Sequence, residues 1–203
     1  MMNRILVLFF SFLSISNASA SFENDLVEAA LFRTTQQVTY DGAYRSIAYP
    51  NGDVPANVGV CSDVVIRSYR SLGIDLQVLV HEDMSEHFSA YPSKHVWGMT
   101  RTDKNIDHRR VLNLEVFFKR NGQEFNISNN PKDYKAGDIV SWMLAGNLPH
   151  IGIVTDQISI TTGNPLIVHN IGKGPELDDM LFTAKITGHF RYKPEVSTVE
   201  KSN

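Results

Sequence analysis

The chain lacks the cysteine pairs that stabilise many small exported proteins, because Cys61 is the only cysteine among its 203 residues. One cysteine cannot form an intrachain disulfide bond. The chain also lacks a charge excess, since 19 Lys and Arg residues stand against 22 Asp and Glu residues, for a formal net charge of −3. We therefore expect no nucleic-acid partner. A Gly-rich phosphate-binding loop is absent as well, and no cofactor is expected.

Long hydrophobic runs are missing too. The apolar run from Ile5 to Ile15 is too short to span a bilayer, which needs roughly 20 residues. It follows Arg4 and precedes the small residues Ala18-Ser19-Ala20. This order is typical of a secretory signal peptide. We therefore expect cleavage after Ala20, a periplasmic or secreted protein, and no membrane anchor after cleavage.

The rest of the sequence is typical of one soluble globular domain, since 42% of the chain is apolar and 20% charged. We expect residues 21–194 to form this domain and residues 195–203 to form a flexible C-terminal tail. Helical periodicity comes first and strand-like runs come second, which predicts an α+β fold with a small antiparallel sheet connected as a meander. The predicted helices cover residues 21–37, 62–72, 75–88 and 113–120, the predicted strands cover 138–142, 150–156, 165–169 and 185–192, and 92–107 is expected to be mainly loop.

Cys61 lies between a loop that contains Gly59 and the predicted helix that begins at Ser62. A thiol at a helix N-terminus faces the positive end of the helix dipole and free backbone N–H groups. Both lower the pKa of the thiol, and the N–H groups can also stabilise an oxyanion. Cysteine is equally common in protein cores. From its position alone, Cys61 is therefore either a buried structural residue or a nucleophile.

A cysteine nucleophile needs a base within hydrogen-bond reach, and two histidines lie in consecutive predicted strands. His150 opens one strand and His169 ends the next. Neighbouring antiparallel strands can place the two side chains next to each other. A third group usually orients the imidazole of the base. His169 or Asn170 can fill this role, but only one of them can face the site, because successive strand residues point to opposite sides.

The order of these residues resembles the NlpC/p60 branch of the papain-like cysteine peptidases. The resemblance rests on Cys61 at a helix start, followed by Gly137-Asp138-Ile139-Val140, His150-Ile151-Gly152-Ile153-Val154 and Ile167-Val168-His169. It implies a papain-like domain and a Cys-His-His triad, with Cys61 as nucleophile, His150 as base and His169 as the residue that orients His150. Tyr49, upstream of Cys61, is implied as an oxyanion residue.

The sequence is also similar to a bacterial exported family called domain of unknown function 1287. The shared segments are Val38 to Gly42, Gly59 to Arg67, Asn105 to Arg110, Leu148 to Val154 and Val168 to Gly172. Together the resemblances imply a monomeric hydrolase that cleaves an amide bond in peptidoglycan stem peptides. One departure concerns Val60, because NlpC/p60 enzymes usually have Asp before the cysteine. This departure favours a substrate other than their usual γ-D-glutamyl peptide.

Two further charged residues, Asp63 and Arg109, are candidates for substrate binding. Asp63 and Arg67 are four residues apart on the predicted helix, which favours a solvent-facing salt bridge over contact with a substrate near the thiol. Arg109, in the cationic segment His108-Arg109-Arg110, is either a solvated loop residue or a clamp for a substrate carboxylate.

Two other functions remain open from the sequence. One is a non-catalytic envelope module that binds peptide or glycan with the same fold. The other is a metallohydrolase that uses His150, His169 and His189, which lie in neighbouring predicted strands. His81 and His87 do not match the H-E-x-x-H zinc motif, because they are not spaced to share one helix face. We therefore expect no metal site.

Overall fold

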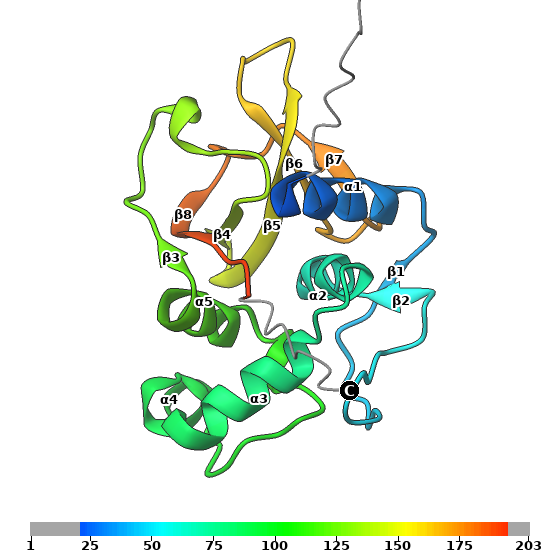
Figure 1. The fold of residues 1–203 in the computed structure, drawn as a ribbon, viewed down its shortest axis with the longest axis vertical. Coiled ribbons are helices and arrows are strands. Elements are labelled where there is room, and N and C mark those ends of the chain that lie inside the picture. Colours follow the sequence, from blue (N-terminus) through cyan, green and yellow to red (C-terminus); the bar gives the residue numbers. More distant parts are fainter. Residues whose placement is uncertain (1–20, 195–203) are drawn as a thin grey trace, which may run out of the picture.

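A computed structural model describes residues 21–194 of the chain. The predicted signal peptide, residues 1–20, and the predicted tail, residues 195–203, lie outside the described residues. Within residues 21–194, no helix is both long and apolar enough to traverse a membrane. Figure 1 shows helices from the first half of the chain packed beside a sheet built from the second half.

Polar side chains begin two of the helices. The Ser21 hydroxyl accepts a hydrogen bond from the Asn24 N–H at the start of α1, and the Asp75 carboxylate accepts one from the Gln77 N–H at the start of α3. Such caps satisfy backbone donors that have no partner inside the helix. The short helix α4 lies in a segment that we expected to be loop, where Gly98 ends it with a positive φ of 64°. The helices are α1 (Phe22–Thr34), α2 (Cys61–Ser71), α3 (Leu76–His87), α4 (Ser93–Trp97) and α5 (Val111–Asn121), with 3-10 turns η1 (Phe88–Ala90), η2 (Asp107–Arg109) and η3 (Pro131–Asp133).

The main sheet has six strands in the order β3-β8-β4-β5-β6-β7, and every neighbouring pair is antiparallel. A separate parallel pair, β1 with β2, precedes α2. The α+β fold with an antiparallel sheet is therefore as predicted, although the short strands β3 and β7 were not. The strands are β1 (Thr39–Tyr40), β2 (Val58–Gly59), β3 (Gln123–Glu124), β4 (Ile139–Leu144), β5 (Leu148–Ile158), β6 (Pro165–His169), β7 (Glu176–Asp178) and β8 (Lys185–Arg191).

The connection between the last two strands departs from a meander. After β7, the chain crosses one face of the sheet, where Met180 and Leu181 are buried. The Trp142 indole N–H donates a hydrogen bond of 2.9 Å to the Leu181 carbonyl oxygen. This crossing brings β8 to the far side of β4, between β4 and β3. The expected meander is therefore wrong for β8.

Both faces of the sheet are buried. Successive strand residues point to opposite sides, so each strand contributes side chains to two cores. On one face, Ile139, Ile153 and Val168 pack in a core with α1, α2 and α5. On the other face, Val154 and Ile167 pack in a second core with the segment that connects β7 to β8. Figure 1 shows α1 and α2 lying across the sheet near β5 and β6. This packing holds the beginning of α2 against β5.

A buried side chain of α3 holds two loops in place. The Gln77 amide nitrogen donates hydrogen bonds of 2.9 Å to the carbonyl oxygens of Ala48 and Lys104. Its amide oxygen accepts a hydrogen bond of 2.8 Å from the Gly52 N–H. Gln77 has no exposed surface. The loop that precedes α2 and the loop that precedes η2 are therefore fixed to the same residue.

Candidate active site

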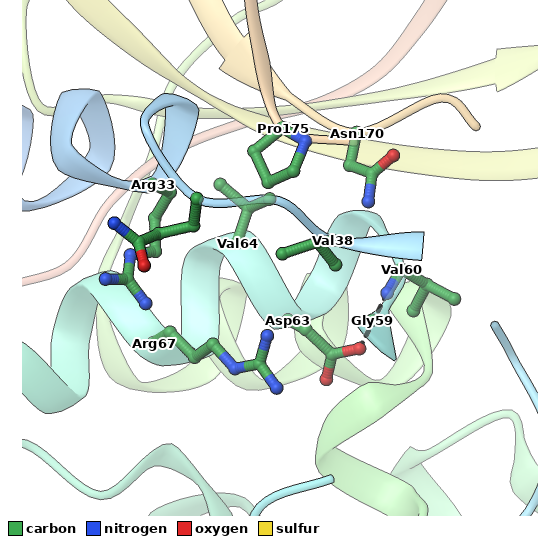
Figure 2. A pocket seen from close by; sticks show the side chains of 10 residues that line it. Arg33, Val38, Gly59, Val60, Asp63, Val64, Arg67, Asn170 and Pro175 are labelled. Atoms are coloured by element: carbon green, nitrogen blue, oxygen red, sulfur yellow. Dashed lines mark hydrogen bonds between the residues drawn. The ribbon is translucent and has the colours of Figure 1, made fainter. Parts of the chain in front are cut away.

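Cys61 is the first residue of α2, and only 4% of its surface is exposed. The beginning of the helix is fixed by Asp63, whose Oδ2 accepts a hydrogen bond of 2.7 Å from the Val60 backbone N–H, shown in Figure 2. The Ser62 hydroxyl adds a hydrogen bond of 2.7 Å to the Arg109 carbonyl oxygen. The thiol is thus held at a rigid helix N-terminus.

Burial is the main influence on the Cys61 thiol, and it raises the pKa to about 11. The backbone amides of Ile151, Ser62 and Cys61 itself act in the opposite direction, because N–H donors stabilise a thiolate. Our expectation of a lowered pKa is therefore wrong, since desolvation outweighs the helix N-terminus. At neutral pH the sulfur keeps its proton, so attack on a carbonyl requires a nearby base.

Two buried histidines meet on the neighbouring strands β5 and β6. His150 Nε2 and His169 Nδ1 are 2.9 Å apart, within hydrogen-bond distance. The Ile151 amide that acts on the Cys61 sulfur belongs to the residue after His150. The Ile151 backbone therefore contacts the thiol, and the predicted base, one residue earlier in the chain, is joined to His169.

Gly152 allows this contact between β5 and β6. Ile153 pairs with Val168, so one step along the register brings Gly152 opposite His169. A Cβ at Gly152 would lie 2.9 Å from the Val168 carbonyl oxygen and 3.1 Å from the His169 Cβ. Only glycine allows the two strands to approach this closely. His150, two residues before Gly152 on the same face, then reaches His169 diagonally.

Burial keeps both rings uncharged. It lowers the pKa of His150 to about 3, with His169 adding a smaller effect, and burial also lowers the pKa of His169. At neutral pH each imidazole therefore has one protonated nitrogen and one nitrogen that can accept a proton. This is the form that a general base needs.

Asn170 faces a different space from the histidine pair. Its Oδ1 accepts a hydrogen bond of 3.0 Å from the Gly172 N–H, while Nδ2 is buried without a partner among the described residues. Figure 2 shows Asn170 above a small cavity with Asp63 and Arg67 on the opposite side. The cavity volume of about 10 Å³ is no more than one water molecule needs. The sequence left open whether His169 or Asn170 contacts His150. In the structure, His169 makes this contact.

Asp63 and Arg67 are not partners, which corrects the expected salt bridge. Asp63 instead pairs with Arg109, with Nε to Oδ1 at 2.9 Å and Nη2 to Oδ2 at 2.8 Å, and both side chains are 3% exposed. Arg67 bonds Asp53 at 2.9 Å. Arg109 was predicted to bind a substrate carboxylate. It instead binds the carboxylate of Asp63, the residue that caps α2.

Tyr40 occupies the place that we expected for Tyr49. The Tyr49 ring packs edge-on against His81 at 5.2 Å and has Lys104 over it at 5.4 Å, on the side of α3. The Tyr40 hydroxyl instead lies within hydrogen-bond reach of Cys61. Burial is the main cause that raises the pKa of the Tyr40 hydroxyl to about 12, and Cys61 adds to this effect. Tyr40 is therefore protonated at neutral pH and can donate a hydrogen bond near the thiol.

Cys61 borders a cleft of about 440 Å³. The Arg110 guanidinium lies 4.3 Å from the centre of the Trp97 ring, a cation–π arrangement. Its ion-pair contact with Asp107 is long, at 3.5 Å. Arg110 thus offers hydrogen-bond donors to the cleft that Arg109 does not. The lining residues are Tyr40, Gly42, Tyr44, Val60, Cys61, Trp97, Ile106, Arg109, Arg110, Val111, Leu112 and Pro149.

His189 does not join the other two strand histidines. Its Nε2 lies 2.8 Å from Asp138 Oδ2, and its ring stacks on Tyr134 at 4.3 Å. Arg191 bonds the other oxygen of Asp138. Across residues 21–194, no three His, Cys, Asp or Glu side chains form a group that could hold a metal ion. The three-histidine site of the metallohydrolase alternative is therefore not formed.

One solved structure shows the same fold at low sequence identity. An N-acetylmuramoyl-L-alanine amidase from Bacteroides uniformis is 12% identical, with a TM-score of 0.52 over 85% of this chain and 99% of that chain. NlpC1 from Trichomonas vaginalis is 18% identical, with a TM-score of 0.43 over 83% of this chain. This chain spans 44% of NlpC1, less than half of its length. The predicted fold class is confirmed.

The sequence comparisons concern the family. Over 153 residues the chain is 54% identical to a protein of Escherichia coli (strain K12) named Uncharacterized protein YijF, which covers 75% of this chain and 73% of that protein. The family described as Domain of unknown function (DUF1287) matches residues 27–192. This match spans all the strands of the main sheet as well as Cys61, His150 and His169. The chain belongs to the DUF1287 family.

Proposed function

We propose that the protein is an exported cysteine hydrolase that cleaves an amide bond in peptidoglycan stem peptides. The observation that carries this proposal is the 2.9 Å contact between His150 and His169 in a fold where the backbone after His150 contacts a buried cysteine at a helix N-terminus. A neutral histidine whose second nitrogen is held by another group is the usual base for a cysteine nucleophile.

The proposed reaction begins when the Cys61 sulfur attacks the amide carbon while His150 takes the thiol proton. His150 Nε2 is occupied by His169, so Nδ1 is the nitrogen that accepts this proton. The backbone N–H groups at the α2 start and the Tyr40 hydroxyl stabilise the oxyanion. The C–N bond then breaks, and His150 gives the proton to the leaving amine. Water hydrolyses the thioester, which releases a carboxylate and restores the thiol.

Three features support a peptidoglycan stem peptide as the substrate. The expected signal peptide sends the chain to the cell envelope. The cleft contains the Arg110 guanidinium, which is suited to the free carboxylates of such peptides. The amidase from Bacteroides uniformis, which shares the fold, is named for an activity on N-acetylmuramoyl-L-alanine.

The chemistry is tested with the chain from Ser21 onward, purified and incubated with peptidoglycan fragments. We expect the release of an amine and a carboxylate in equal amounts. Cys61→Ser and His150→Ala should each abolish this release. His87→Ala should retain it, because His87 is an exposed histidine on α3 that contacts Asp83.

The alternative is a module that binds peptide or glycan without cleaving it. It predicts that wild type and Cys61→Ser bind the fragments equally and that neither releases a product. Hydrolysis that survives in Cys61→Ser would contradict the proposed nucleophile.

The substrate class is tested with Arg110→Gln. Loss of the guanidinium should raise KM for fragments with free carboxylates and change kcat little. Amidated fragments should lose this sensitivity. Arg120→Gln is the matched control, because Arg120 pairs with Asp83 and does not line the cleft.

A further inference from the structure

His169 has a second ring nitrogen that its contact with His150 does not use. His169 Nε2 is buried and has no hydrogen-bond partner among the described residues. The side chain is only 1% exposed, so solvent cannot readily satisfy this nitrogen. A carboxylate oxygen, Asp178 Oδ2, lies 3.7 Å away. The orphaned nitrogen therefore faces one acidic side chain.

The sheet register explains this arrangement. In the pairing of β6 with β7, Glu176 lies opposite His169, and Asp178 lies opposite Ile167. Asp178 is thus a diagonal neighbour of His169 on the same face. His150, His169 and Asp178 form a row of side chains across β5, β6 and β7.

The protons on the two rings are linked, because one hydrogen bond joins the rings. When His169 is protonated at Nε2, its Nδ1 accepts a hydrogen bond from His150 Nε2–H, and His150 Nδ1 is free to act as a base. When His169 is protonated at Nδ1, it donates to His150 Nε2. A neutral His150 then has its proton on Nδ1 and cannot accept the thiol proton.

We propose that Asp178 is a positioning residue that, through His169, holds His150 in the tautomer able to accept a proton. A carboxylate that faces His169 Nε2 attracts an N–H group and repels a lone pair at that position. Glu176 adds negative charge near the same ring. This inference rests on the proposed role of His150 as the base and extends the pair to a row of three residues.

The test uses the chain from Ser21 onward with ¹⁵N-labelled histidine, because two-bond N–H couplings show which ring nitrogen carries the proton. In wild type, His169 should be protonated at Nε2. Asp178→Asn should shift the proton toward Nδ1, because the new amide can donate to Nε2. The variant keeps an oxygen that can accept the 2.8 Å hydrogen bond from the Asp179 N–H. We also expect kcat to fall by roughly 10-fold with KM unchanged.

Asp179→Asn is the matched control, because it removes the same charge from the next residue. The Asp179 carboxylate bonds Thr162 and Asn164, and the variant should leave the histidine spectrum unchanged. A wild-type proton on His169 Nδ1, or the same spectrum in both variants, would overturn the inference. The spectrum does not depend on turnover. An inactive wild type with the expected shift in Asp178→Asn would refute the hydrolase proposal while supporting the positioning role.

Discussion

At the scale of single residues, the two tyrosines upstream of Cys61 have different surroundings. Tyr40 ends β1, and the Cys61 sulfur influences its hydroxyl. Tyr49 lies in the following loop against His81. A hydroxyl that remains protonated at neutral pH can donate a hydrogen bond to an oxyanion formed at the thiol. Only Tyr40 is in a position to do so.

Tyr40→Phe should therefore lower kcat by about 100-fold, the usual effect of losing one oxyanion donor. The melting temperature should change little, because the Tyr40 side chain is 44% exposed. Tyr49→Phe is the control and should keep the wild-type kcat. Steady-state kinetics on peptidoglycan fragments provide the measurement. Equal losses in both variants would argue against a specific role for Tyr40.

Residue types in a fixed order were enough to single out Cys61, His150 and His169, because each begins or ends a periodic segment. The ion-pair partner of a charged side chain cannot be recognised from such a pattern. Arg109 lies 46 residues from Asp63, and their contact depends on how η2 packs against α2. Tyr40 was missed for the same reason, since the path of the loop after β1 decides which tyrosine reaches the thiol.

At the scale of elements, the beginning of α2 depends on one buried ion pair. Asp63 caps the helix through Val60 and neutralises Arg109. Removal of one partner from a buried pair leaves the other charge without compensation, which is more costly than the pair itself is stabilising. This interaction links α2 to η2, and through η2 to the wall of the cleft.

Asp63→Ala should therefore lower the free energy of unfolding by about 3–5 kcal/mol. Asp41→Ala breaks the more exposed Asp41–Arg45 pair and should lower the free energy of unfolding far less, because an exposed ion pair contributes little to stability. Urea unfolding followed by circular dichroism gives both values. Similar losses of unfolding free energy in the two variants would show that the Asp63–Arg109 pair does not stabilise the beginning of α2.

The long elements were predictable and the short ones were not. The helices α1, α2, α3 and α5 and the strands β4, β5, β6 and β8 have enough residues to show a period. The strands β3 and β7 have only two and three residues, so alternation cannot be recognised. The position of β8 beside β4 depends on the buried crossing at Leu181, which local sequence does not encode.

At the scale of the whole molecule, two buried neutral histidines make stability depend on pH. Burial lowers the pKa of His108 to about 4 and of His150 to about 3. An unfolded histidine has a pKa near 6.5. The unfolded chain therefore binds more protons than the folded one as the pH falls below 6.5. The stability that these groups contribute is complete above pH 6.5 and is lost toward pH 4 and 3.

The free energy of unfolding should fall by roughly 1.4 kcal/mol per pH unit for each histidine in this range. His108→Gln should remove the contribution of His108, so the free energy of unfolding should depend less on pH between pH 6 and 4.5. Denaturant unfolding at several pH values checks this slope. His87→Gln serves as the control, because His87 is exposed and should leave the slope unchanged. Parallel curves for wild type and His108→Gln would contradict the prediction.

The three hydrogen bonds of Gln77 also have a thermodynamic consequence. They hold the loops before α2 and η2 in one conformation, and Asn105 joins the same loops by accepting a hydrogen bond of 3.1 Å from the Ile47 N–H. A ligand that enters the cleft meets walls that are already ordered. Association then requires conformational entropy to be lost mainly by the ligand, because the protein has lost its share on folding. The cleft is preorganised by folding itself.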